Sequence, residues 1–238
     1  MTALEIAVTS VVGAGIARDE GADRIELCSA LELGGVTPSI GLLDDVCEAF
    51  PGAVHVLVRP RPGDFLYDAA EARVVELDIR EALRRGAAGV VVGALTSAGE
   101  VDIALVRRWA DAARECRPEA VVTLHRAVDH ARDHLAAVES VVGIVDRVLT
   151  SGGAPTAREG LAALAAAKQA VGDQLEVMAG GGVRPEDLPA LAAVVDAIHL
   201  SAKRSVSSGA GVALGIDDDG SHPVTDRDTV RTAVRALR

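Results

Sequence analysis

An α/β barrel of eight strand–helix units, a (β/α)8 TIM barrel, is the fold class that the sequence predicts. Short apolar runs rich in Val and Ile recur at intervals of roughly 20 to 35 residues, the size of one strand–helix unit. The length of 238 residues suits one such domain. The hydrophobic share of 49% supplies a large core, and the scarcity of aromatic residues fits short parallel strands covered by Ala-rich helices.

Each predicted strand is a short apolar run that ends in polar or glycine-containing residues. The eight strands are expected at residues 4–8, 24–28, 54–59, 89–93, 120–125, 146–150, 175–179 and 197–200. An open doubly wound sheet is the main alternative, and it would carry a glycine-rich nucleotide-binding turn after the first strand. The turn here, residues 9–13, reads TSVVG and lacks that pattern, so a closed barrel is favoured.

The segments between the strands carry helix start and stop signals. Asp68 and Glu71 have the spacing of a capping box, and Pro185 can open the seventh helix because its missing N–H is not needed in the first turn. One irregular stretch, residues 204–224, follows the last strand of a single domain that spans residues 1–238. We expect this stretch to be either a lid over the barrel mouth or a disordered excursion.

Composition excludes several classes of partner. A formal charge of −11 argues against nucleic acid and against an anionic membrane surface, because both require clustered basic residues. The sequence has neither the pattern of a signal peptide nor an apolar segment of roughly 20 residues that could cross a bilayer. Three widely spaced cysteines, Cys28, Cys47 and Cys116, favour a reducing cytoplasm over a disulfide framework or a zinc site.

Charged residues at the predicted strand ends are the first candidates for chemistry, since TIM barrels react at that end. Glu26 lies in an apolar run, and a buried carboxylate is costly unless it is paired or ligated. Arg59 and Arg61 flank a proline and could clamp a carboxylate or phosphate. The structural alternative is that Arg59 pairs with Glu26, and that the other arginine pairs with Asp64 or Asp129.

Two histidines are further candidates. His125 ends the fifth predicted strand, and His199 lies in the eighth. Each could serve as an acid or base near neutral pH or as a metal ligand, and Asp129 could orient a ring. The alternative for each is a core histidine with satisfied hydrogen bonds.

Two glycine-containing loops are candidate anion-binding sites, because loops after strands six to eight commonly hold phosphate in barrels. The expected residues are Thr150, Ser151 and Gly152 in the first loop, and Gly180, Gly181 and Gly182 in the second. Glycines expose backbone N–H groups, and a helix beginning at Pro185 would add the positive end of its dipole. The alternative is that glycine serves tight turn geometry.

Several of these segments together resemble the CutC copper-homeostasis family. The motifs are residues 21–29 (GADRIELCS), 34–39 (GGVTPS), 59–67 (RPRPGDFLY), 124–129 (LHRAVD), 149–152 (LTSG) and the glycine triplet 180–182. The match spans residues 4 to about 201. The resemblance implies a TIM barrel, a cytoplasmic homo-oligomer and a name drawn from copper tolerance.

The resemblance also bears on copper. Family members often carry one cysteine in the first strand and one in the second, and copper(I) prefers such thiolates. This chain has Cys28 in the second strand but Ala7 in the first. A copper(I) site at Cys28 would therefore need His125, His199 or a second subunit to complete it.

Two functions stay open at this point, and the sequence does not decide whether the chain is an enzyme. The first is a copper homeostasis protein that binds copper(I) through Cys28. The second is a lyase or isomerase acting on a small phosphorylated or carboxylated metabolite at the barrel rim. In that case Glu26 or His125 would be the acid or base, and Arg59 and Arg61 would hold the anion.

Overall fold

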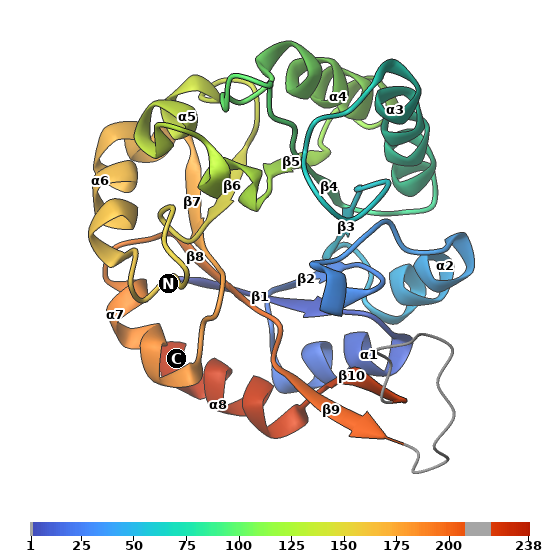
Figure 1. Ribbon diagram of the computed structural model, residues 1–238. Coiled ribbons are helices and arrows are strands. Elements are labelled where there is room, and N and C mark those ends of the chain that lie inside the picture. Colours follow the sequence, from blue (N-terminus) through green and yellow to red (C-terminus); the bar gives the residue numbers. More distant parts are fainter. Residues whose placement is uncertain (1, 208–219) are drawn as a thin grey trace.

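The computed structural model describes residues 2–207 and 220–238 and confirms the TIM barrel (Figure 1). Eight parallel strands pair in chain order, and β1 closes the barrel by pairing with β8. The strands are β1 Ala3–Val8, β2 Arg24–Leu27, β3 Val54–Leu57, β4 Gly89–Val92, β5 Val121–Leu124, β6 Arg147–Thr150, β7 Glu176–Ala179 and β8 Ala197–Leu200. All eight predicted strands are therefore present.

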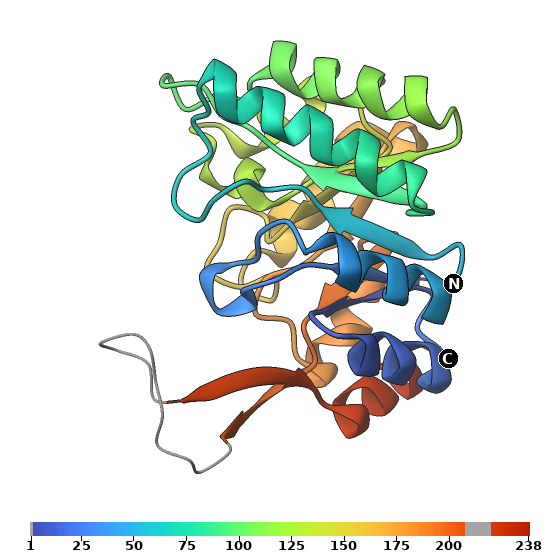
Figure 2. The ribbon, with the colours of Figure 1, turned by 90° about the vertical axis from the view of Figure 1, so that its right-hand side faces the viewer.

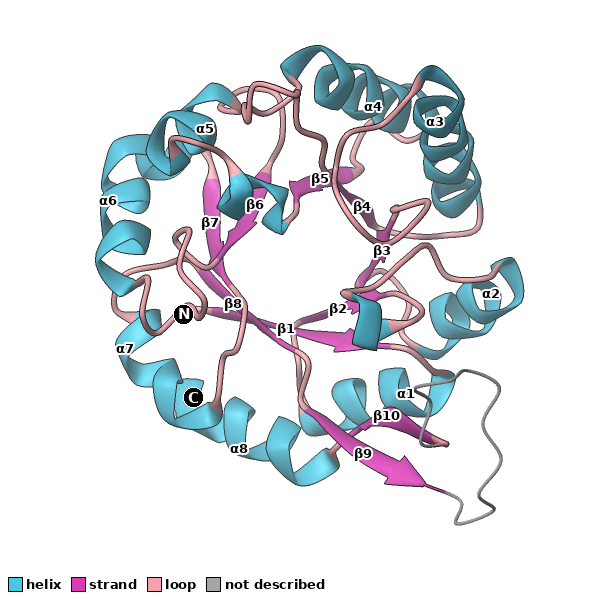
Figure 3. Ribbon diagram, viewed as in Figure 1, coloured by secondary structure: helices cyan, strands magenta, loops and turns pink. Residues whose placement is uncertain are grey.

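Helices surround the strands on the outside of the barrel (Figure 3). They are α1 Val11–Glu20, α2 Ile40–Ala49, α3 Ala69–Arg84, α4 Ile103–Cys116, α5 His134–Ser140, α6 Leu161–Val171, α7 Leu188–Ala192 and α8 Arg227–Leu237. Four short 3-10 helices complete the loops: η1 Leu31–Leu33, η2 Arg126–His130, η3 Gly172–Gln174 and η4 Pro185–Asp187. None of the helices in the described ranges is long and apolar enough to cross a membrane.

The predicted start signals are borne out in one case and modified in another. Asp68 and Glu71 form the capping box of α3, with both reciprocal hydrogen bonds present. Pro185 opens the 3-10 helix η4 rather than α7, which follows at Leu188 and has only five residues. Because α7 is this short, the helix dipole expected at this position is correspondingly small.

The segment after β8 is more ordered than the sequence predicts. Lys203–Ser207 forms β9 and Ser221–Thr225 forms β10, and the two pair as an antiparallel ribbon. Figure 2 shows this ribbon extending away from the barrel. The expectation of an irregular stretch is wrong for residues 204–207 and 221–224, and residues 208–219 lie outside the described residues.

The apolar core lies mainly between the strands and the surrounding helices. The interior of the barrel itself is built of successive layers of side chains. At the amino-terminal end of the barrel, Arg24 and Arg147 form ion pairs with Glu5 and Glu176. Small apolar clusters fill the middle: Cys28 with Leu57 and Val91, and Leu149 with Met178 and Ala197. The carboxyl-terminal end is left for the site.

Candidate functional site

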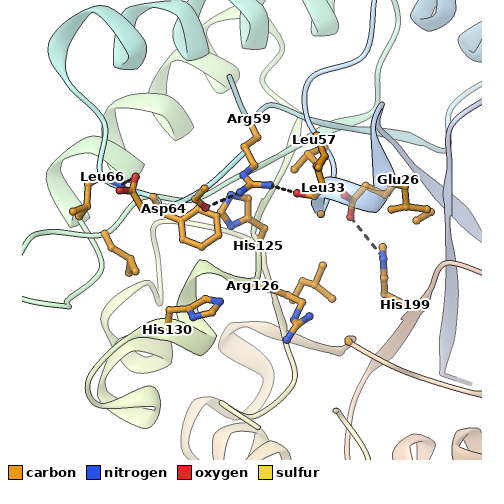
Figure 4. Close-up of a pocket in the computed structure, with 18 of the residues that line it drawn as sticks. Glu26, Leu33, Leu57, Arg59, Asp64, Leu66, His125, Arg126, His130 and His199 are labelled. Atoms are coloured by element: carbon orange, nitrogen blue, oxygen red, sulfur yellow. Dashed lines mark hydrogen bonds and ion pairs between the residues drawn. The ribbon is translucent and has the colours of Figure 1, made fainter. Parts of the chain in front are cut away.

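A cavity of about 660 Å³ opens at the carboxyl ends of the barrel strands, where TIM barrels carry their sites. Its wall combines apolar and ionisable side chains (Figure 4). The ionisable lining residues are Glu26, Arg59, Asp64, His125, Arg126, His130 and His199, and the large apolar ones are Leu31, Leu33, Leu57, Phe65, Leu66, Leu95 and Leu149. A cavity of this size accommodates a small metabolite.

Glu26 and His199 face each other in the wall of this cavity (Figure 4). Strand register brings them together, because His199 is level with Glu5 of β1 and Glu26 is level with Ala7, two residues further along β1. His199 Nδ1 lies 2.8 Å from Glu5 Oε1 and 3.6 Å from Glu26 Oε2. Glu26 Oε2 is buried and accepts no hydrogen bond from the part of the chain that the structure describes.

The three groups perturb one another's ionisation. Burial raises the pKa of Glu26 to about 7, opposed by the charge of His199 and assisted by that of Glu5. Burial alone would raise the pKa of Glu5, but the hydrogen bond from His199 and nearby positive charges hold it well below its usual range. Burial lowers the pKa of His199, yet the two carboxylates outweigh it and raise that pKa overall. Glu26 can therefore give or take a proton near neutral pH.

His125 supplies a neutral imidazole to the same cavity. Its Nδ1 accepts the Ala127 backbone N–H at 3.1 Å, so the ring proton lies on Nε2. Nε2 is buried and has no partner among the described residues. Burial, followed by the charge of Arg59, lowers the pKa of His125 to about 3, so the ring stays uncharged. A neutral histidine with a free N–H can donate to a ligand oxygen.

Arg59 does not pair with Glu26, which corrects the structural alternative drawn from the sequence. Its guanidinium donates from Nη1 to the carbonyls of Leu33 (3.2 Å) and Gly35 (3.0 Å) and from Nη2 to that of Gly63 (2.8 Å). The residue is 6% exposed and still contributes to the cavity wall. These bonds form because β3 ends before Arg59, so its side chain reaches the loops after β2 and β3.

Arg61 does not line the cavity and so does not act there as the expected second clamp. Its guanidinium forms ion pairs with Asp64 at 3.0 Å and with Glu71, the capping residue of α3. The sequence alternative that one of the two arginines pairs with Asp64 is the arrangement present. Pro60 separates Arg59 from Arg61, which lies in this exposed turn, and the two side chains therefore reach different partners.

Asp129 ties down the loop after β6 instead of orienting a histidine of the cavity. Its carboxylate accepts hydrogen bonds from Arg126 Nε at 2.8 Å and from the Thr150 hydroxyl. The histidine nearest to this carboxylate is His134, whose Nε2 lies 3.9 Å away. His134 does not line the cavity. The expected role is therefore corrected, because η2 carries Asp129 towards β6.

The same carboxylate changes the expectation of an anion cradle at residues 150–152. The Ser151 N–H donates to Asp129 at 2.9 Å, and the Gly152 N–H donates to Thr150 Oγ1 at 2.9 Å. Gly152 has a positive φ of 74° and lies close to the Gly160 carbonyl, as tight turn geometry requires. The amides predicted to hold an external phosphate are thus satisfied within the protein.

The second glycine loop serves close packing. A Cβ on Gly180 would lie 2.4 Å from a methyl of Leu149, and one on Gly181 would lie 2.7 Å from the guanidinium carbon of Arg126. Gly181 lines the cavity, whereas Gly180 and Gly182 do not. The glycines let the backbone approach these side chains.

Cys28 lies in the barrel interior and not in the cavity wall. Burial, with smaller contributions from the charges of Glu26 and Glu32, raises the pKa of its thiol well above the usual range. No described cluster of potential metal ligands includes it. The cluster that could hold an ion is Glu5, Glu26 and His199, an oxygen- and nitrogen-donor set that does not suit copper(I).

Arg126 and His130 are lining residues that the sequence analysis did not choose. Arg126 directly follows His125 at the end of β5, and a strict reading of strand ends would have included it. His130 ends η2 and is an exposed residue that lines the cavity.

Comparison with known proteins agrees with this architecture. The sequence profile of the CutC family matches residues 2–204. The chain belongs to the CutC family. Family protein CutC from Histophilus somni is 39% identical over 236 residues, covering 95% of this chain and 96% of the relative. That from Chromobacterium violaceum is 40% identical over 243 residues, covering 99% and 96%.

Solved structures show the same relationship. The CutC protein from Streptococcus agalactiae superposes with a TM-score of 0.77 at 25% identity, covering 84% of this chain and 99% of that one. Thiamine phosphate pyrophosphorylase from Pyrococcus furiosus, at 15% identity and a TM-score of 0.59, shares the fold alone.

Proposed function

We propose that this CutC chain is an enzyme of the lyase or isomerase type, in which Glu26 transfers a proton to or from a small metabolite bound in the cavity. The observation that carries the proposal is the position of Glu26: it is 6% exposed, its Oε2 has no hydrogen-bond donor among the described residues, and it faces both the cavity and His199. A buried carboxyl oxygen without a hydrogen-bond partner is costly to fold, and such costly groups cluster at functional sites.

Under this proposal each group has a role. Glu26 as carboxylate removes a proton from the carbon next to a carbonyl, and the electron pair moves onto the carbonyl oxygen. The Nε2–H of neutral His125 donates to that oxygen and stabilises the enolate. Glu26, now protonated, returns the proton at another carbon or to a departing group. His199 and Glu5 pair with each other beside Glu26; the negative charge of Glu5 favours the protonated form of Glu26, and the positive charge of His199 favours the carboxylate.

Deuterium exchange tests this proposal directly. The protein is incubated in D2O with pyruvate and phenylpyruvate, and loss of the C3–H signal is followed by proton NMR. We expect exchange above the buffer rate, a decrease of about 100-fold in Glu26→Gln, and an unchanged rate in Glu32→Gln, an exposed residue of η1 outside the cavity wall. Exchange that is equal in Glu26→Gln, or absent from the unmodified protein, contradicts the assignment.

Copper homeostasis is the function that membership of the CutC family supports, and the name of the Streptococcus agalactiae protein states it for that relative. Here copper(I) would bind Cys28 in a cytoplasmic homo-oligomer, with further donors from a second subunit. Against it, the buried thiol has a raised pKa, and the first strand carries Ala7 where a second thiolate would be needed.

Competition with a copper(I) chelator separates the two candidates. Under the copper proposal, Cys28→Ala loses copper(I) binding and Cys116→Ala, a helix position outside the barrel interior, retains it. Equal copper affinity in both variants would remove Cys28 from consideration. Subcellular fractionation and light scattering test the cytoplasmic location and the oligomeric state.

A further inference from the structure

Arg126 is a charged cavity residue to which proton transfer gives no role. It lines the cavity and its side chain is 40% exposed. Its Nε donates to Asp129 at 2.8 Å and its Nη2 to Ser151 Oγ at 3.2 Å. Nη1 makes no hydrogen bond with any residue in 2–207 or 220–238. One edge of the guanidinium is therefore fixed by the protein, and the other edge is open.

Gly181 holds this guanidinium in place. A Cβ on Gly181 would lie 2.7 Å from the guanidinium carbon, 2.9 Å from Nη1 and 3.0 Å from Nε of Arg126. The side chain thus packs flat against the backbone of the loop after β7. Arg126 consequently loses little rotamer freedom when it binds a ligand.

The charges around the cavity favour a ligand with one negative charge, although the whole chain carries −11. Arg59 is buried and forms no ion pair with the described residues. Asp64 is paired with Arg61 at 3.0 Å, and the other lining carboxylate faces an imidazole. Asp129 offsets the charge of Arg126. The guanidinium of Arg59 therefore remains uncompensated, and a buried charge without a partner is unfavourable.

Apart from Thr96, Ser97 and the histidines, the rest of the wall is mainly apolar. Six leucines and Phe65 line it, and they come mostly from the loops after β2, β3 and β4. Such a surface gains more by covering an alkyl or aryl group than by covering a sugar or a second charge. In the loop after β6 the Ser151 and Gly153 amides are already bound to Asp129 and the Gly152 amide to Thr150 Oγ1, so they offer no phosphate site.

We propose that the cavity binds a monoanionic carboxylate with an apolar alkyl or aryl body, and that Arg126 is its anchor through Nη1. A carboxylate matches the planar donor edge of a guanidinium, whereas a dianionic phosphate ester would bring an uncompensated charge into an apolar cavity. The inference rests on the proposed function only in taking this cavity as the substrate site.

Titration calorimetry with 3-phenylpropanoate, 3-phenylpropanamide and 2-phenylethyl phosphate tests the class of ligand. These probes share a body and differ in charge. We expect the carboxylate to bind about tenfold or more tightly than the amide or the phosphate ester, the scale of one charge-assisted hydrogen-bonded pair. Equal binding of the amide, tighter binding of the phosphate ester, or no binding of the carboxylate overturns the proposal.

Variants of Arg126 test the anchor. Arg126→Gln should weaken carboxylate binding about tenfold, and Arg126→Lys should recover part of it through charge alone. Arg132→Gln is the matched control, because Arg132 is an exposed arginine of the next turn whose partner is Glu100 and which does not line the cavity. Thermal melting verifies that each variant folds. Unchanged affinity in Arg126→Gln overturns the assignment of the anchor.

The two proposals fail separately. Glu26→Gln should bind 3-phenylpropanoate within about threefold of the unmodified protein while losing deuterium exchange. Retained binding with no exchange in the unmodified protein would contradict proton transfer and leave the carboxylate site in place. Deuterium exchange in a protein that does not prefer the carboxylate probe would contradict the carboxylate site and leave proton transfer in place.

Discussion

Glu26 couples the stability of the barrel to pH. Its pKa is about 7 in the folded protein, because of burial first, and 4.5 is the ordinary value. The folded state therefore holds this proton more tightly, so the stabilisation is complete below pH 4.5 and is lost as the pH rises through about 7.

Glu26→Gln removes this loss, since the amide does not ionise. We expect the free energy of unfolding of Glu26→Gln, relative to the unmodified protein, to increase between pH 5 and pH 8 by on the order of 2 kcal/mol. Urea unfolding at the two pH values measures it. A difference that does not change with pH would contradict the raised pKa.

Gly93 leaves the space that the His125 ring occupies. A Cβ at position 93 would lie 2.5 Å from both Cε1 and Nδ1 of that ring. Gly93→Ala should therefore displace His125, break its hydrogen bond from Ala127, and lower the free energy of unfolding by about 1 to 3 kcal/mol. Deuterium exchange should fall as well.

Gly15→Ala is the control for this prediction, because a Cβ there meets nothing within 4 Å in the middle of α1. It should be neutral or stabilising by up to about 1 kcal/mol. Thermal melts of the two variants that shift equally would contradict the packing argument.

At the scale of elements, Asp129 links η2 to the loop after β6. Its carboxylate accepts bonds from two backbone amides as well as from Arg126 and Thr150. Asp129→Asn places an N–H₂ group among donors, so we expect a loss of about 2 to 4 kcal/mol in urea unfolding, together with weaker carboxylate binding.

Asp133→Asn makes the same chemical change four residues later. Asp133 is the N-cap of α5 and accepts a hydrogen bond from the Ala136 N–H. Asn caps helices about as well as Asp, so this variant should unfold within about 0.5 kcal/mol of the unmodified protein. Equal losses in the two variants would show that Asp129 has no special role.

For the whole molecule, the ionic layer at the amino-terminal end of the barrel fixes the strands that carry the site. Arg147 is 5% exposed, pairs with Glu176 at 2.8 Å and donates to His55 Nδ1 at 3.1 Å. Arg147→Met would leave buried acceptors without a donor, so we expect a loss of about 3 to 5 kcal/mol.

The same substitution at Arg84, an exposed residue at the end of α3, should change stability by at most about 0.5 kcal/mol. Guanidinium chloride unfolding compares the two variants. Because Arg147 does not line the cavity, carboxylate binding by folded Arg147→Met should be unchanged. A small loss in Arg147→Met would mean that the layer does not stabilise the barrel.

The sequence by itself determined the strands and their order. Periodicity and turn residues act locally, so eight apolar runs and the capping box at Asp68 could be read without knowing any contact. The rule that barrels react at their strand ends likewise placed Glu26, Arg59, His125 and His199 around one cavity.

Only the tertiary structure decided which of these residues interact. Glu26 meets His199, not Arg59, because closure of the barrel pairs the first strand with the last. The Asp129 carboxylate occupies the expected phosphate site, because η2 directs it towards the loop after β6. Arg126 of η2 lines the cavity, whereas Arg61, between Pro60 and Pro62, does not. Such pairings depend on distances between segments remote in sequence, which local patterns do not encode.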